Sequence, residues 1–132
     1  MKENIHQSGK RKKAIARATL KKGSGNVFIN NIKLEVYGSN LVRERIREPL
    51  ILAGDKTKKL DIKVTSRGGG VSGQADAIRL AIAKALSEYD SSLKDVYSEY
   101  DRQLLVADVR RKESSKPNSQ GQARAKRQKS YR

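Results

Sequence analysis

The stretch from Leu60 to Leu86 constrains the fold most, because three consecutive glycines join a strand pattern to a helix pattern. Leu60, Ile62 and Val64 alternate with polar residues, which predicts a half-buried strand. After the glycines, apolar residues recur at helical spacing: Ala75, Ile78, Ile82, Ala85, Leu86 and Tyr89. We expect Ser72 to cap this helix. A glycine-rich joint exposes backbone N–H groups beside a helix N-terminus, which favours binding of anions, phosphate above all.

Gly68, Gly70 and Gly73 satisfy the G-x-G-x-x-G pattern of dinucleotide-binding proteins. That interpretation requires a second strand with an acidic residue about 20 residues further on, but here a second helix pattern follows the first. The phosphate loop of nucleotide hydrolases requires Lys after the last glycine, where this chain has Gln74. Two interpretations remain: a tight turn without a ligand, and a backbone contact to a polyphosphate.

The positive charge lies at the two ends of the chain. Net charge is +16 over 132 residues; residues 1–22 carry +7, residues 110–132 carry +8, and residues 23–109 are nearly neutral. Blocks of like charge cannot bury a core, so we expect both ends to be disordered unless a polyanion neutralises them. The predicted organisation is a basic N-terminal arm over 1–13, one globular domain over 14–107 and an extended basic tail over 108–132.

The remaining patterns predict the order β-β-β-α-β-α-α. Strands are expected over 16–21, 27–29 and 32–36, the last two joined by a turn at Asn30-Asn31, because Asn tolerates positive φ. A helix capped by Ser39 or Asn40 should end or kink at Pro49. After the main helix, Ser92 and Asp95 resemble a capping box for a last helix, whose tyrosines are expected in its core and rim.

The composition argues against catalysis. The only histidine, His6, lies in the predicted arm, and the acids of the body are scattered among bases. We therefore predict no enzyme activity, no metal, no cofactor and no small-molecule substrate. There is no cysteine and no apolar run of membrane-spanning length, so we expect a soluble, cytoplasmic protein without membrane contact.

Nucleic acid is the expected partner, because Lys and Arg that neutralise phosphates release counterions. Aromatic residues make up only 5% of the chain, which leaves few platforms for base stacking and favours binding to folded RNA by shape and phosphate. Two alternatives stay open: a general nucleic-acid-binding protein that compacts DNA, and a nucleotide-using enzyme at the glycine joint.

Three segments, 23–31, 68–86 and 105–113, resemble the family of small-subunit ribosomal protein nine, and the ending 127–132 resembles its archaeal and eukaryotic branch. The resemblance implies an α/β (α+β) two-layer sandwich like the second domain of small-subunit ribosomal protein five. That fold contains a left-handed βαβ crossover, against the usual right-handed rule. It also implies a structural role in the head of the small subunit, with rRNA, P-site tRNA and neighbouring head proteins as partners.

The charge pattern and the resemblance together define the candidate sites. Candidate rRNA-binding residues are Lys10, Arg11, Lys12, Lys13, Arg17, Arg67, Gly68, Gly69, Gly70, Ser72, Gly73, Gln74, Arg110, Arg111, Lys112, Lys116, Arg124, Lys126 and Arg127. Candidate tRNA-binding residues are Lys129, Ser130, Tyr131 and Arg132, of which Arg132 is expected to contact a phosphate. The polar turn Lys56–Lys59 is either one more RNA contact or a solvated loop, and is left out of the sites.

Overall fold

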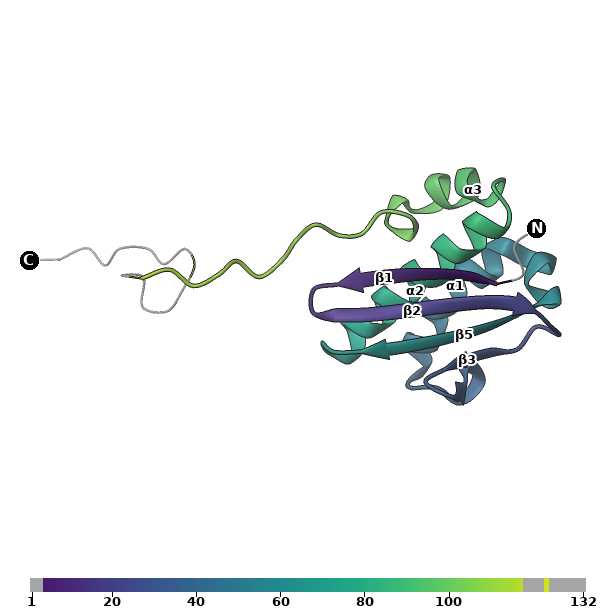
Figure 1. The fold of residues 1–132 in the computed structure, drawn as a ribbon, viewed down its shortest axis with the longest axis horizontal. Coiled ribbons are helices and arrows are strands. Elements are labelled where there is room, and N and C mark those ends of the chain that lie inside the picture. Colours follow the sequence, from purple (N-terminus) through teal and green to yellow (C-terminus); the bar gives the residue numbers. More distant parts are fainter. Residues whose placement is uncertain (1–3, 118–122, 124–132) are drawn as a thin grey trace, which may run out of the picture.

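The computed structural model describes residues 4–117 and residue 123. A five-stranded sheet has the order β1-β2-β5-β3-β4, and Figure 1 shows α1 and α2 behind it. The strands are β1 (Ile5–Arg11), β2 (Ala14–Lys22), β3 (Val27–Ile29), β4 (Ile32–Lys33) and β5 (Leu60–Arg67), and the helices are α1 (Asn40–Ala53), α2 (Val71–Tyr89) and α3 (Leu93–Tyr100). Short 3-10 segments span Leu34–Val36, Gly54–Lys59 and Arg102–Leu104. This arrangement confirms a mixed α/β fold.

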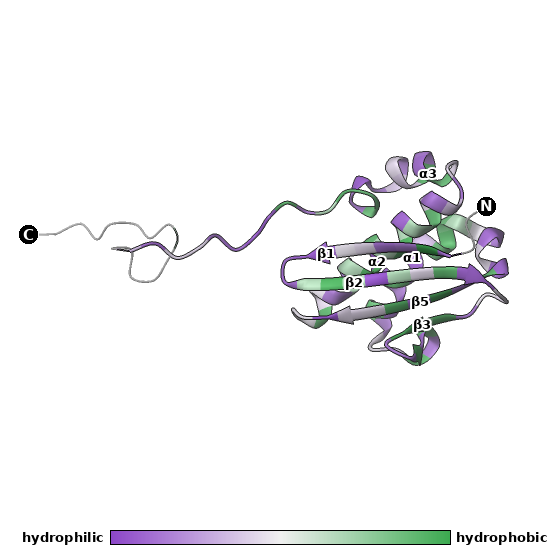
Figure 2. Ribbon diagram, in the orientation of Figure 1, coloured by the Kyte–Doolittle hydropathy of each residue, from purple (hydrophilic) through white to green (hydrophobic). Residues whose placement is uncertain are grey.

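The core lies between one face of the sheet and α2. Alternate residues of β2 and β5 are buried, and Figure 2 shows hydrophobic and hydrophilic residues following one another along β2. The facing side of α2 is rich in alanine, which lets helix and sheet approach closely. At Gly9 a Cβ atom would lie 2.3 Å from the carbonyl oxygen of Ala77, so α2 leaves no room for a side chain there.

The predicted N-terminal arm is wrong for residues 5–11, which form the edge strand β1. β1 pairs antiparallel with β2 from Ile5 opposite Leu20 to Arg11 opposite Ala14, and Ile5 is buried. Lys12, with φ of +53°, lies in the turn between the two strands. His6 is therefore part of the sheet, where its Nδ1 lies 3.0 Å from Thr19 Oγ1. The basic run misled the prediction because a hairpin turn splits it, which keeps its charges at the surface.

Pro49 does not end α1, contrary to one of the two predicted outcomes. The Ser39 hydroxyl accepts a hydrogen bond from Val42 N–H at the start of the helix, and Gly54, with φ of +63°, follows its end. Pro49 has no N–H to donate, but it is buried and its carbonyl accepts a hydrogen bond of 2.8 Å from the Tyr97 hydroxyl. Tertiary packing thus holds the helix through the proline. Burial also raises the pKa of Tyr97.

Several local predictions also need correction. The strand expected over 32–36 is only Ile32–Lys33, followed by a 3-10 turn. Ser92 does not cap α3, because its backbone is helical and its hydroxyl donates to Asp90. Gly70, rather than Ser72, is the N-cap of α2.

Other local predictions are confirmed. Asn30 and Asn31 both have positive φ, as the turn required, and of the tyrosines of α3, Tyr97 is buried whereas Tyr100 lies at the rim. β3 and β5 are parallel neighbours joined through α1, and the hand of this crossover stays a prediction.

Candidate nucleic-acid interface

Three segments that are distant in sequence meet at one end of the sheet. They are the β1–β2 turn, the glycine joint between β5 and α2, and the first residues of the C-terminal tail. They line a groove of about 920 Å³, which we call the basic groove: Arg11, Lys12, Lys13, Gly69, Gly70, Val71, Ser72, Gly73, Arg110, Arg111 and Lys112. The lining includes six Lys or Arg side chains and no Asp or Glu. The groove therefore concentrates positive potential around the start of α2.

The three glycines of the joint differ in whether the backbone or the packing requires a glycine at their position. Gly68 and Gly69 have φ of +77° and +64°, and Cβ atoms there would lie 2.7 Å from Lys13 O and 3.0 Å from Ala14 N. The tight turn against the hairpin requires glycine at both positions. Gly70 has φ of −101°, and no heavy atom lies within 4 Å of a Cβ built on it. Neither strain nor packing requires glycine at position 70, which lines the groove.

The N-terminus of α2 carries no side-chain cap. Gly70 contributes no side chain, and the first helical hydrogen bond runs from Gln74 N–H to Gly70 O at 2.9 Å. The N–H groups of the first turn have no partner within a helix, and the helix dipole places positive charge there. The Gln74 side chain donates to Gly68 O at 3.0 Å, so it stabilises the turn. These N–H groups suit an anion approaching over Gly70.

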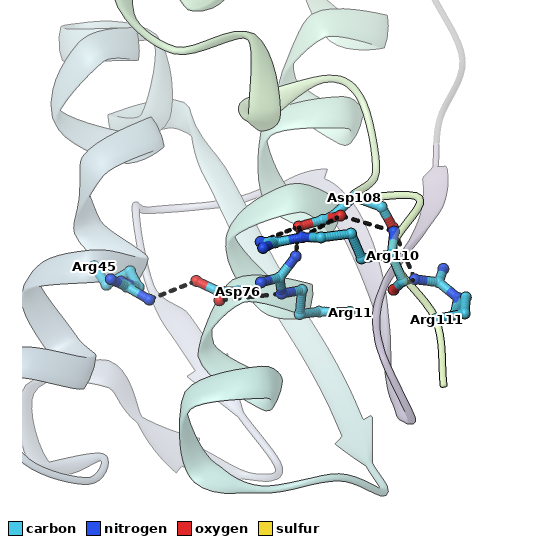
Figure 3. A network of polar contacts seen from close by, with 6 residues as sticks. All are labelled: Arg11, Arg45, Asp76, Asp108, Arg110 and Arg111. Atoms are coloured by element: carbon cyan, nitrogen blue, oxygen red, sulfur yellow. Dashed lines mark hydrogen bonds and ion pairs between the residues drawn. The ribbon is translucent and has the colours of Figure 1, made fainter. Parts of the chain in front are cut away.

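An ion-pair network fixes the start of the tail beside the groove, and Figure 3 shows it as a chain of alternating charges. Arg11 pairs with Asp108, and its Nε lies 3.8 Å from Asp76 Oδ2. Asp76 also pairs with Arg45 of α1, at 2.8 Å. Asp108 accepts hydrogen bonds from Arg110, through N–H at 2.9 Å and through Nε at 3.0 Å. We call these five residues the ionic anchor.

The ionic anchor connects four parts of the chain and was missed by sequence reasoning. The side chains of Asp108 and Arg11 are only 9% and 20% exposed, so solvent screens their pairing weakly. Asp76 and Asp108 look like ordinary surface acids in the sequence, and no periodic pattern links them to Arg11. Arg11 was predicted to bind RNA, and the structure places it in this network at the edge of the groove.

The other candidate residues lie in three places. Lys10 and Arg67 lie on the sheet near the groove, and Arg17 is exposed in the middle of β2. Lys116 pairs with Glu113 at 2.7 Å within the tail. The remaining candidates lie outside the described residues: Arg124, Lys126, Arg127, Lys129, Ser130, Tyr131 and Arg132.

The Lys56–Lys59 turn forms contacts within the protein. Lys56 pairs with Asp90 and donates a hydrogen bond of 2.9 Å to the Ser92 hydroxyl, while Lys58 pairs with Asp55. Hydrogen bonds from Lys56 and from Ser92 lower the pKa of Asp90 to about 2. The turn thus links the end of α1 to the α2–α3 corner.

The described part of the chain holds neither a cluster of metal ligands nor a membrane-spanning helix. Among residues 4–117 and 123, no three His, Cys, Asp or Glu side chains gather as metal ligands would. None of the helices in that part has the length and apolar character needed to cross a membrane.

Comparison with known proteins gives a consistent result. The family model described as "Ribosomal protein S9/S16" matches residues 9–132. A protein of Picrophilus torridus named "Small ribosomal subunit protein uS9" is 52% identical over 134 residues, covering all of both chains. Proteins of the same name from Thermoplasma acidophilum and Methanothrix thermoacetophila are 54% and 50% identical, covering 95% and 97% of this chain and 98% of each relative. The chain belongs to the ribosomal protein S9/S16 family.

Proposed function

We propose that this protein is a structural constituent of the small ribosomal subunit and binds small-subunit rRNA through the basic groove. The observation that carries the proposal is the convergence of the hairpin turn, the glycine joint and the tail around an uncapped helix N-terminus, with six cations and no acid. Membership of the family and the names of the relatives support the ribosomal role. The role is architectural and requires no catalysis.

The groove suits the sugar–phosphate backbone of a folded RNA. One phosphate is bound by the N–H groups at the start of α2, and Gly70 lets it approach because no side chain covers the backbone. Arg110 and Arg111 bind adjacent phosphates, for which the guanidinium fork has matching geometry. Lys12 and Lys13 add charge from the opposite wall. Such contacts recognise the shape of the RNA more than its bases, and they weaken as salt rises.

The tail extends the same function beyond the groove. Arg124, Lys126 and Arg127 bind further rRNA, and Lys129–Arg132 reach the anticodon stem-loop of P-site tRNA in the head of the cytoplasmic ribosome, beside neighbouring head proteins. The ionic anchor supports this proposal because it fixes where the tail leaves the body. We also assign the body to the fold of the second domain of small-subunit ribosomal protein five, on the parallel β3–β5 pair joined through α1.

Gly70→Asp separates binding from folding. Asp is a better N-cap than Gly, and the extended backbone of Gly70 admits it, so stability in urea should stay equal or rise by a few tenths of a kcal/mol. The carboxylate would occupy the space proposed for a phosphate, so affinity for a transcript of the rRNA head domain should fall at least about tenfold. Ser98→Asp, at an exposed position of α3, is the charge-matched control. Equal affinity of both variants would contradict the proposed groove.

The tail is tested separately with a chain that ends before Lys129. We expect this chain to remain on small subunits while P-site tRNA binds them more weakly. Unchanged tRNA binding would remove the tRNA contact from the proposal and leave the rRNA contact standing.

A further inference from the structure

The second face of the sheet carries its own set of cations. α1 and α2 lie behind the sheet, and no described helix covers the face toward the viewer in Figure 1. Since side chains alternate along a strand, the residues that lie between the buried ones of β1, β2 and β5 point to this open face. Its six cations are Lys10, Arg17, Lys21, Lys33, Lys63 and Arg67, all exposed.

Among the described strand residues, one acid, Asp61, lies on the open face, and it is engaged locally. Asp61 Oδ1 accepts hydrogen bonds of 3.1 Å from the backbone N–H groups of Ser24 and Asn26, in the β2–β3 turn. Its charge therefore stabilises that turn at the far end of the sheet. Lys21 lies directly opposite Asp61 in the register of β2 and β5, whereas Lys10, Arg17, Lys33 and Arg67 have no acid opposite them among the strand residues described.

The centre of the open face has a hollow of about 550 Å³. Its lining includes Arg17 and the hydroxyl-bearing residues Ser8, Thr19 and Thr65, of which Thr19 has its Oγ1 3.0 Å from His6 Nδ1. In the register of the sheet, Arg17 lies between Ser8 of β1 and Thr65 of β5. Hydroxyls beside a guanidinium can donate to phosphate oxygens and can both donate to and accept from ribose hydroxyls.

An RNA backbone fits this face better than a protein surface does. A protein interface normally has an apolar centre, whereas the apolar side chains that the described strands place on the open face are Ile15 and Phe28, both half-buried and in different rows. Ile15 lies between Lys10 and Arg67, and Phe28 is paired with Lys63 and Lys33. Charge complementarity thus selects a polyanion.

We propose that the open face of the sheet is a second RNA-backbone surface, continuous with the basic groove. Lys10 and Arg67 form the junction, because Lys10 directly precedes the groove residue Arg11 and Arg67 is separated from the groove residue Gly69 by Gly68 alone. The surface then runs through Arg17 and the hollow at the centre of the open face to Lys63 and Lys21. A single folded RNA contacts both surfaces around the end of the sheet. This inference rests on the proposed rRNA binding and adds residues that the groove does not contain.

The test uses the full chain and a transcript of the small-subunit rRNA head domain. One variant combines Lys21→Gln, Lys33→Gln and Lys63→Gln on the open face. The control combines Lys58→Gln, Lys94→Gln and Arg102→Gln, which removes the same charge from exposed positions elsewhere. Urea unfolding midpoints show whether both variants fold. If the open-face triple variant does not fold, Lys63→Gln alone replaces it. Affinity is measured over a series of salt concentrations.

We expect the open-face variant to lose roughly tenfold or more in affinity, and its dependence of log K on log salt to become shallower by about 2 to 3. The control should change much less. Equal losses in both triple variants would overturn the inference, since only overall charge would then matter. It would equally be overturned if the open-face variant bound RNA normally but lost contact with other head proteins. Failure of the unmutated chain to bind the transcript would instead reject the proposed function itself.

Discussion

Gly9→Ala tests whether the N-terminal strand is packed as the structure shows. The added Cβ would lie 2.3 Å from the carbonyl oxygen of Ala77 and 2.7 Å from the N atom of Ala81, both backbone atoms of α2. Because backbone atoms cannot rotate away, either β1 or α2 must shift. Overpacking of this kind costs about 1–3 kcal/mol, and two backbone clashes place the expected loss near the upper end, about 3 kcal/mol. That is a large part of the 5–15 kcal/mol typical of a small domain.

Urea unfolding followed by circular dichroism measures this loss, with Gly70→Ala as the control. A Cβ at Gly70 meets no heavy atom within 4 Å, so this variant should lose no more than about 1 kcal/mol through its weaker cap. If Gly9 had room for a Cβ atom, Gly9→Ala would instead stabilise the protein by about 0.4–1 kcal/mol, because alanine lowers the conformational entropy of the unfolded chain. If Gly9→Ala were as stable as the unmutated chain, β1 would not pack on α2, and the basic N-terminus would be the arm that its charge suggests.

Three further substitutions test the hydrogen bond between α3 and α1, the ion pair that holds the start of the tail, and the loss of stability in acid. Tyr97→Phe removes the hydrogen bond to Pro49 O and should cost about 1 kcal/mol in urea unfolding; no change would mean that apolar packing alone holds α1 through the proline. Asp108→Asn removes the charge that pairs with Arg11, so backbone NMR order parameters of residues 109–113 should fall while those of α2 stay unchanged. If the order parameters of residues 109–113 did not change, the ionic anchor would be refuted. The pKa of Asp90 is lowered to about 2 from its usual value near 4 by hydrogen bonds from Lys56 and from Ser92. The ionised Asp90 therefore contributes its full stabilisation above about pH 4, and this contribution is lost as pH falls toward 2. Asp90→Asn should make the free energy of unfolding decline less steeply between about pH 4 and about pH 2. An identical decline in both proteins would contradict the role given to these hydrogen bonds.

The sequence predicted those elements whose patterns are strong. β2, β5 and α2 follow the alternation and the helical spacing of their apolar residues closely. β1 escaped prediction because Ile5 is its only large buried side chain and Gly9 gives no hydrophobic signal. Pro49 misled for a related reason: its local preference is overridden by burial and by the Tyr97 hydrogen bond, which joins distant parts of the chain.

For the candidate site as well, some features could be predicted from the sequence and others only from the fold. The basic residues of the groove could be identified because their charge is visible in the sequence, while their convergence depends on the fold. The different roles of Gly69 and Gly70 could not be predicted, since only the position of the hairpin turn shows which glycine is packed. Asp76 and Asp108 carry no pattern, and their importance appears only where α2, β1 and the tail meet.

The most direct test of the account is sedimentation of the tagged full chain with small ribosomal subunits after a high-salt wash. The unmutated chain is compared with a variant that combines Arg110→Gln, Arg111→Gln and Lys112→Gln. We expect the unmutated chain to remain with small subunits and the variant to be released at lower salt, because three phosphate contacts are lost. If the unmutated chain instead washes off and binds duplex DNA as well as structured RNA at equal salt, the ribosomal role is contradicted and a general nucleic-acid-binding protein takes its place.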